Sequence, residues 1–140
     1  AKNYLMICLY NNLGNTNIAY SPNLIFTNST TYIPVKNFNI TVLTKFVGKQ
    51  YLGNIDSKQS VLDYYTNTDL NASYDRKINR GIKSIVFSGL INNVFDEVYE
   101  SNGYFYTYDD NSSGSTITYG GAGFYPQAGI NFLLGMSLKF

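Results

Sequence analysis

The chain has 140 residues, a formal net charge of +1, and 14% charged residues against roughly 25% in an average globular protein. It contains 14 Tyr, 9 Phe and 18 Asn, but no Trp and no His. The absence of His excludes Ser-His-Asp and Cys-His nucleophiles, His metal ligands and a His-based pH switch. The single Cys8 excludes an internal disulfide and a thiolate zinc site. The near-neutral charge argues against nucleic acid as a partner, and no apolar run is long enough for a transmembrane helix.

Six segments carry the alternation or the β-branched and aromatic content that is typical of strands. In chain order they are residues 2–12, 23–33, 37–51, 68–76, 82–93 and about 125–140. In four of them, alternate positions separate an apolar set from a polar set, which indicates strands with one apolar and one polar face. The third and fourth segments carry the apolar set Phe38, Ile40, Val42, Thr44, Phe46, Leu70, Ala72 and Tyr74. The fifth and sixth segments carry Ile85, Phe87, Gly89, Ile91, Ile130, Phe132, Leu134, Met136, Leu138 and Phe140.

The connections between these segments alternate strictly in length. Residues 34–36 and about 77–81 are short connections, whereas residues 13–22, 52–67 and 94–124 are long ones. Transmembrane β-barrels have this alternation, because their periplasmic turns are short and their extracellular loops are long. The segments are also near or above the roughly 9–11 residues that a tilted membrane strand needs. Strand-end aromatics (Tyr10, Tyr32, Phe38, Phe46, Tyr51, Phe140) suit interfacial girdles, although Tyr and Phe are also simply good strand formers.

The sequence therefore predicts an all-β chain, an antiparallel up-and-down meander of about six long strands that forms part of a transmembrane β-barrel. At the carboxyl end, residues 125–140 (YPQAGINFLLGMSLKF) resemble the final strand of TonB-dependent outer-membrane receptors, in the branch that is not SusC-like. Residues 14–22, 47–54, and 92–95 leading to 99–104 resemble the same family in the same order. Gly53 and Val94 are mild departures from the pattern.

This resemblance implies that residues 1–140 are the carboxyl-terminal segment of a receptor barrel of about 22 strands, without its plug domain and TonB box. It implies import of a scarce bulky nutrient, such as an iron–siderophore, haem or a cobalamin-like compound, across the bacterial outer membrane. The implied partners are outer-membrane lipid, the barrel-assembly machinery, the rest of the barrel and plug, and the TonB complex through the missing amino-terminal part. No catalytic residue, metal or cofactor is expected.

Two sets of candidate site residues follow. Rigid amphipathic rings in the long segment 94–124 suit ligand capture, and we assign this role to Tyr104, Tyr106, Tyr108 and Tyr119, the alternative being a solvated surface loop. The terminal alternation resembles the signal that the barrel-assembly machinery reads, carried by Phe132, Leu134, Met136, Leu138 and Phe140, the alternative being an ordinary lipid-facing strand. The run Gly120–Gly123 lacks the lysine and helix of a phosphate loop, so we reject that interpretation.

A rival hypothesis is a secreted or surface β-sandwich whose aromatic loops bind glycan or protein. It predicts that the face carrying Phe87, Phe132 and Leu134 packs against a second sheet, whereas the membrane hypothesis predicts that this face points outward. A small hydrolase is a poor alternative, because without His it would need an Asp/Glu pair and the carboxylates gather in one long connection.

Overall fold

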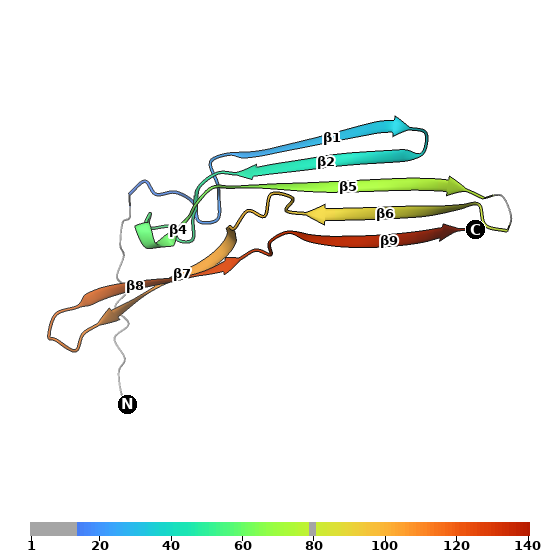
Figure 1. Cartoon of the computed structure of the whole chain (residues 1–140). Coiled ribbons are helices and arrows are strands. Elements are labelled where there is room, and N and C mark those ends of the chain that lie inside the picture. Colours follow the sequence, from blue (N-terminus) through green and yellow to red (C-terminus); the bar gives the residue numbers. More distant parts are fainter. Residues whose placement is uncertain (1–13, 79–80) are drawn as a thin grey trace, which may run out of the picture.

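The computed structural model describes residues 14–78 and 81–140, and this part of the chain is all-β (Figure 1). Its strands are β1 (Ile25–Val35), β2 (Phe38–Val47), β3 (Gln50–Tyr51), β4 (Val61–Leu62), β5 (Tyr65–Lys77), β6 (Ser84–Asn92), β7 (Glu100–Asp110), β8 (Ile117–Pro126) and β9 (Asn131–Lys139). A 3-10 helix, η1 (Lys58–Ser60), precedes β4. Within the described ranges no helix is long and apolar enough to cross a membrane. The strand expected at residues 2–12 lies outside the described residues.

The main body is one antiparallel sheet of five strands in the order β1-β2-β5-β6-β9. Within this sheet each strand pairs with the sheet strand that follows it along the chain, so the predicted antiparallel meander is confirmed for these five strands. The sheet is open, since β1 and β9 lie at opposite edges and do not pair with each other. Two further hairpins lie within the long connections: β3-β4, with strands of two residues, and β7-β8, with strands of 11 and 10 residues.

The two ends of the sheet differ. At one end, which we call the turn end, β1 and β2 are joined by Lys36 and Asn37, with Asn37 at φ +67°. The end of β5, the start of β6 and the carboxyl terminus lie at the same end (Figure 1). The opposite end, the loop end, carries residues 48–64 and 93–130 with both of these hairpins. The predicted alternation of short and long connections is therefore confirmed for the described strands.

Three predicted boundaries are wrong. The segment 94–124 was expected to be a loop, but much of it forms the hairpin β7-β8. The last strand begins at Asn131 instead of Tyr125, because Tyr125 belongs to β8 and pairs with Asn102 of β7 in that hairpin. The strand expected over residues 37–51 ends at Val47, since Gly48 lies against the backbone of Leu24 and the chain turns there into β3.

The register places the predicted apolar positions on one common face, which we call the apolar face. Phe38 pairs with Tyr74, Tyr74 with Phe87, and Phe87 with Met136, so one row crosses four strands. Side chains on this face include Phe26, Tyr32, Ile40, Val42, Phe46, Leu70, Ala72, Ile85, Ile91, Phe132, Leu134 and Leu138. No second sheet covers it in the described ranges, and Leu134 is 85% exposed. The packing required by a β-sandwich is therefore absent from this part of the chain.

The opposite face, which we call the polar face, carries mostly hydroxyl, amide and charged side chains. They include Thr27, Ser29, Thr31, Asn39, Thr41, Lys45, Asn67, Asp69, Asn71, Ser73, Asp75, Ser84, Ser88, Asn92, Asn131, Ser137 and Lys139. Among the described residues, the buried apolar side chains are only Val47, Leu52 and Leu62, all at the loop end. The long sheet therefore does not enclose a hydrophobic core of its own.

Candidate functional site

The candidate site is the hairpin β7-β8, which projects from the loop end of the sheet (Figure 1). Its tip reverses around Gly114, whose φ of +79° suits glycine. Side-chain hydrogen bonds support the turn: the Ser112 amide donates to Asp110 Oδ1 at 2.9 Å, and Thr116 Oγ1 donates to Asn111 Oδ1 at 2.8 Å. The hydrogen bond from Ser112 holds the pKa of Asp110 below its usual value. The tip is thus a shaped turn.

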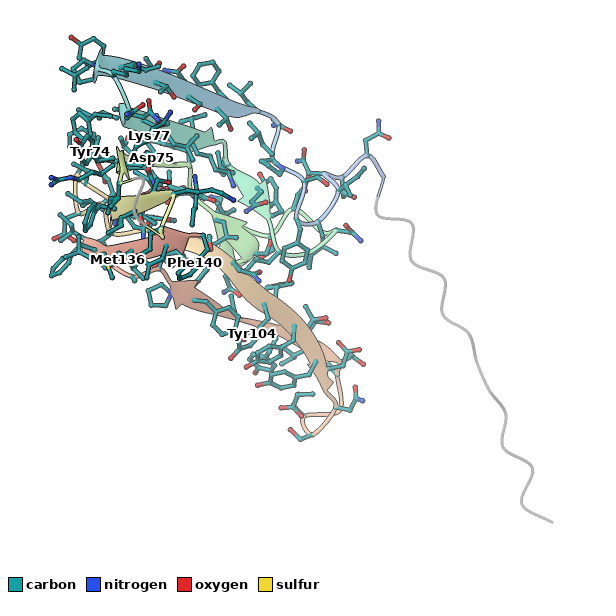
Figure 2. All side chains as sticks on the ribbon, turned by 90° about the vertical axis from the view of Figure 1, so that its right-hand side faces the viewer. Tyr74, Asp75, Lys77, Tyr104, Met136 and Phe140 are labelled. Carbon is teal, nitrogen blue, oxygen red and sulfur yellow. The ribbon has the colours of Figure 1, made fainter. Side chains whose placement is uncertain are left out.

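The predicted ligand-binding tyrosines lie together on one face of this hairpin. Tyr104, Tyr106 and Tyr108 alternate along β7, and Tyr119 on β8 pairs directly with Tyr108. Successive rings lie 6.3 and 6.4 Å apart between centroids with interplanar angles of 20° and 19°, and the Tyr108 and Tyr119 rings are 5.4 Å apart. A fifth ring, that of Tyr125, lies 6.1 Å from Tyr104. We call these five residues the tyrosine platform; Figure 2 shows Tyr104 within it.

Glycines on β8 make room for these rings. A Cβ atom on Gly123 would come within 2.5 Å of the Tyr104 ring, and one on Gly121 within 2.6 Å of Tyr106. Each ring therefore lies across the backbone of the partner strand, where it covers a residue that offers no side chain for strand packing. The rejected phosphate-loop interpretation of Gly120–Gly123 is replaced by this role. The five rings remain between 44% and 56% exposed, so they form an accessible aromatic surface.

The other face of the hairpin attaches it to the loop end. Phe105 lies against Gly53 and Gly120, each of which has room for it because it lacks a side chain. Tyr20 Oη donates a hydrogen bond of 3.1 Å to the Gly103 carbonyl. At Gly103 an added Cβ would lie 2.5 Å from the Gly123 carbonyl oxygen and 2.9 Å from Leu52. Close packing on this side leaves the tyrosine platform as the free side.

A group of hydrogen bonds centred on Asn93, which we call the Asn93 hub, fixes the path of the chain from β6 into this hairpin. Asn93 is 3% exposed and has φ +52°, a conformation that Asn tolerates better than most residues. Its Nδ2 donates to the carbonyls of Glu97 at 2.9 Å and Ala128 at 3.3 Å, and its Oδ1 accepts from the Glu97 amide at 3.0 Å. Its backbone amide donates to Asp69 Oδ1 at 2.9 Å. The chain entering β7 is therefore tied to the segment that leads into β9.

A neighbouring contact adds a second tie. Asp96, also at positive φ, accepts a hydrogen bond of 2.8 Å from the Ile130 amide. The rings of Tyr65 and Tyr99 stack with centroids 4.3 Å apart and planes 14° apart. Burial, and to a smaller extent the charges of Tyr65 and Asp69, raise the pKa of Tyr99 above its usual value. These contacts hold the base of the hairpin against β5 and the start of β9.

The tyrosine platform offers ring faces and hydroxyl groups, which suit a ligand with a flat apolar or aromatic surface and hydrogen-bonding edges. The carboxylates beside it are already engaged, since Asp109 Oδ1 accepts from Thr118 Oγ1 at 2.6 Å. Among the described residues no group of three His, Cys, Asp or Glu side chains is placed to hold a metal ion.

A separate pocket of about 430 Å³ lies on the polar face. Its lining is mainly hydroxyl and amide groups with one carboxylate, contributed by Ser29, Thr41, Leu43, Asp69, Asn71, Leu90 and Asn92. The carboxylate, Asp69, accepts hydrogen bonds from Asn67 Nδ2 at 3.0 Å and from the Asn93 amide. Asp69 therefore anchors the Asn93 hub through its Oδ1 atom.

The five residues of the predicted assembly signal lie in or directly after the edge strand β9. Phe132, Leu134, Met136 and Leu138 alternate on the apolar face, and Phe140 continues the alternation one residue beyond the strand. All five side chains are exposed. Each of the two predicted sets thus lies together in the structure. Tyr125, which joins the tyrosine platform, and the Asn93 hub were missed by sequence reasoning. The period-2 alternation of Tyr104, Tyr106 and Tyr108 was the available signal for a hairpin.

In comparisons with known proteins, no protein-family model, no curated protein and no solved structure matches this chain.

Proposed function

We propose that this chain forms part of the wall of a bacterial outer-membrane β-barrel, in a receptor of the TonB-dependent class that imports a scarce bulky nutrient. The observation that carries the proposal is the apolar face, which crosses β2, β5, β6 and β9, reaches β1 at Phe26 and Tyr32, and is uncovered. Large exposed apolar surfaces mark contacts with membranes or partners. Lipid on this face and a polar lumen on the other is the arrangement of transmembrane barrel strands.

The length of the apolar face supports the proposal that this face contacts the membrane. Aromatic side chains stand near both ends of it: Phe38 packs edge-on against Tyr74 at the turn end, and Phe46 against Tyr64 at the loop end. Phe38 and Phe46 are eight residues apart on β2, which is roughly 27 Å along a strand. A tilt of about 40° brings that span to about 20 Å of membrane thickness, close to the apolar band of barrels.

The sequence resemblance supports the finer assignment to the TonB-dependent class. In this proposal the tyrosine platform belongs to the extracellular lip that captures the nutrient, and the polar face lines the interior where the plug sits. The remainder of the barrel pairs with the sheet edges, because unpaired edges are not tolerated in lipid. The edge strand β9 with Phe140 presents the assembly signal. The rival sandwich needs a second sheet over the apolar face, and the described residues provide none.

The test is cysteine labelling in Gram-negative cells that express the complete reading frame, with Cys8 and any other native cysteine replaced by serine. Ser113→Cys places a thiol at the hairpin tip, and Lys36→Cys places one in the turn between β1 and β2. We expect a membrane-impermeant maleimide to label Ser113→Cys on intact cells, and Lys36→Cys only after the outer membrane is permeabilised. Equal labelling of both on intact cells, or recovery of the protein in the soluble fraction, would refute the proposal.

A further inference from the structure

The described charges are segregated between the two ends of the sheet. The turn end carries five basic residues, namely Lys36, Arg76, Lys77, Lys83 and Lys139, which we call the turn-end cations. Asp75 is the only Asp or Glu side chain that accompanies them in the described ranges, and the carboxyl terminus lies at the same end. The other eight Asp and Glu residues lie toward the loop end, together with Lys45, Lys49 and Lys58. Neither the strand pattern nor the packing requires this separation of basic from acidic residues, because the polar face carries hydrophilic side chains along its whole length.

Most of the turn-end cations have no partner carboxylate in the described chain. Lys139 Nζ lies 3.3 Å from Asp75 Oδ2, and this is the one ion pair among the described residues. Register places Lys77 and Lys139 on either side of Ser84, so two like charges share a row of the polar face. Figure 2, which looks onto the turn end, shows Lys77 beside Asp75 and Tyr74. Four cations are thus available to an external anion.

Arg76 adds a second and independent observation. Its register partner is Ile85, so it stands at the turn-end limit of the apolar face. A pocket of about 340 Å³ lies there, lined by Arg76, Lys77, Ile78, Ile85 and Phe87. The pocket therefore has two basic residues, Arg76 and Lys77, beside apolar ones. An inorganic anion would use only the cations, whereas an amphiphile with an anionic head would use both.

We propose that the turn end binds the phosphate group of an anionic phospholipid, with Arg76 and Lys77 at the phosphate and the adjoining acyl chain against Ile85 and Phe87. The other turn-end cations surround the same headgroup layer. The inference rests on the proposed function, because it requires the apolar face to meet a bilayer. Long basic side chains at the border of an apolar surface extend toward lipid phosphates while their stems stay in the apolar region. The acidic loop end faces away from that layer.

The experiment compares flotation of the protein expressed from the complete reading frame with vesicles of phosphatidylcholine and with vesicles that also contain phosphatidylglycerol. The turn-end variant carries Arg76→Gln, Lys77→Gln and Lys83→Gln. The matched control carries Lys45→Gln, Lys49→Gln and Lys58→Gln, which removes the same charge from the loop end. Each basic residue near an anionic surface contributes about fivefold to partitioning. We expect the turn-end variant to lose on the order of 100-fold of the preference for phosphatidylglycerol vesicles, and the control to retain it.

The outcomes separate this inference from the proposed function. If the native chain floats equally with both vesicles, or if both triple variants lose the preference equally, the lipid site is refuted while membrane insertion stands. If the native chain floats with neither, the proposed function fails. Inorganic phosphate that abolishes the preference more than chloride of equal ionic strength would reassign the site to free phosphate. Arg76→Lys keeps the charge and should keep the preference for phosphatidylglycerol vesicles. That result would show that the loss in the glutamine variant is electrostatic.

Discussion

The Asn93 hub allows a quantitative prediction about how the hairpin β7-β8 is held. Replacing Asn93 with Ala removes three side-chain hydrogen bonds, two to Glu97 and one to Ala128. At about 1 kcal/mol each, these bonds amount to about 3 kcal/mol. Ala at φ +52° adds about 1 kcal/mol of backbone strain. The local opening free energy of the segment should therefore fall by about 4 kcal/mol.

The assay is hydrogen–deuterium exchange of the folded protein in detergent. A loss of about 4 kcal/mol corresponds to an increase of roughly a thousandfold in the exchange rate at the Glu97 amide. The Ile130 amide, held by Asp96, should also exchange faster, while amides in β2 and β5 stay unchanged. Asn93→Gly removes the same hydrogen bonds but tolerates the positive φ, so it should lose about 3 kcal/mol and isolate the backbone contribution.

The reasoning is refuted if Asn93→Ala and Asn93→Gly both leave the Glu97 amide as protected as in the native chain. It is also refuted if the faster exchange spreads evenly over β2 and β5, because the hub would then support the whole sheet. Asn93→Asp provides a harsher case. It keeps an acceptor for the Glu97 amide, but its second carboxylate oxygen faces the carbonyls of Glu97 and Ala128 at a buried position, so its exchange should be faster than that of Asn93→Gly.

Three further predictions concern other parts of the molecule. Leu134→Arg on the apolar face should reduce membrane assembly by about 2–4 kcal/mol, measured as the folded fraction in vesicles, whereas Ser137→Arg on the polar face should have little effect. Gly121→Val should displace the ring of Tyr106, because an added Cβ comes within 2.6 Å of it, and faster nitration of that ring would report the change. The raised pKa of Tyr99 stabilises the fold below the usual value of 10.0 and ceases to do so as the pH rises through the higher folded value. Tyr99→Phe should therefore lessen the loss of stability above pH 10.0, measured by unfolding at alkaline pH.

The main sheet was predictable because its signals are local. In a strand, alternate side chains point to the same face, so the alternation of Phe38, Ile40 and Val42 already predicts that they share one face. The lengths of the connections then predict which strands are neighbours. The pairing of Phe38 with Tyr74 and of Phe87 with Met136 confirms both steps. Those pairs required no knowledge of long-range packing.

The hairpin β7-β8 was not predictable in the same way. Tyr104, Tyr106 and Tyr108 alternate like a strand, but the partner segment contains Gly120–Gly123, and glycine is unfavourable in strands. The hairpin forms because the rings cover those glycines, a cross-strand contact that neither segment reveals alone. The grouping of Tyr119 with Tyr108 depends on this pairing.

The Asn93 hub depends on even more distant information. The Asn93 side chain contacts Ala128, which is 35 residues away in the sequence. Its role also requires a left-handed backbone at Asn93, and an Asn residue by itself does not predict that conformation. The start of β9 was misplaced for a related reason, since Tyr125 belongs to the hairpin and the chain passes Gly129 before the strand begins.

The order of the strands in the main sheet has a consequence for how it forms. Strands that are neighbours in the main sheet also follow one another among its strands along the chain, so no segment must pass over a strand that is already in place. The sheet can therefore grow by sequential zippering of hairpins, each closing a loop whose entropic cost rises only slowly with its length. The insertion of β7-β8 between β6 and β9 lengthens one such closure without altering the path of the others. Loop-end hairpins can thus change in length and sequence while the order in which the sheet zips together stays the same.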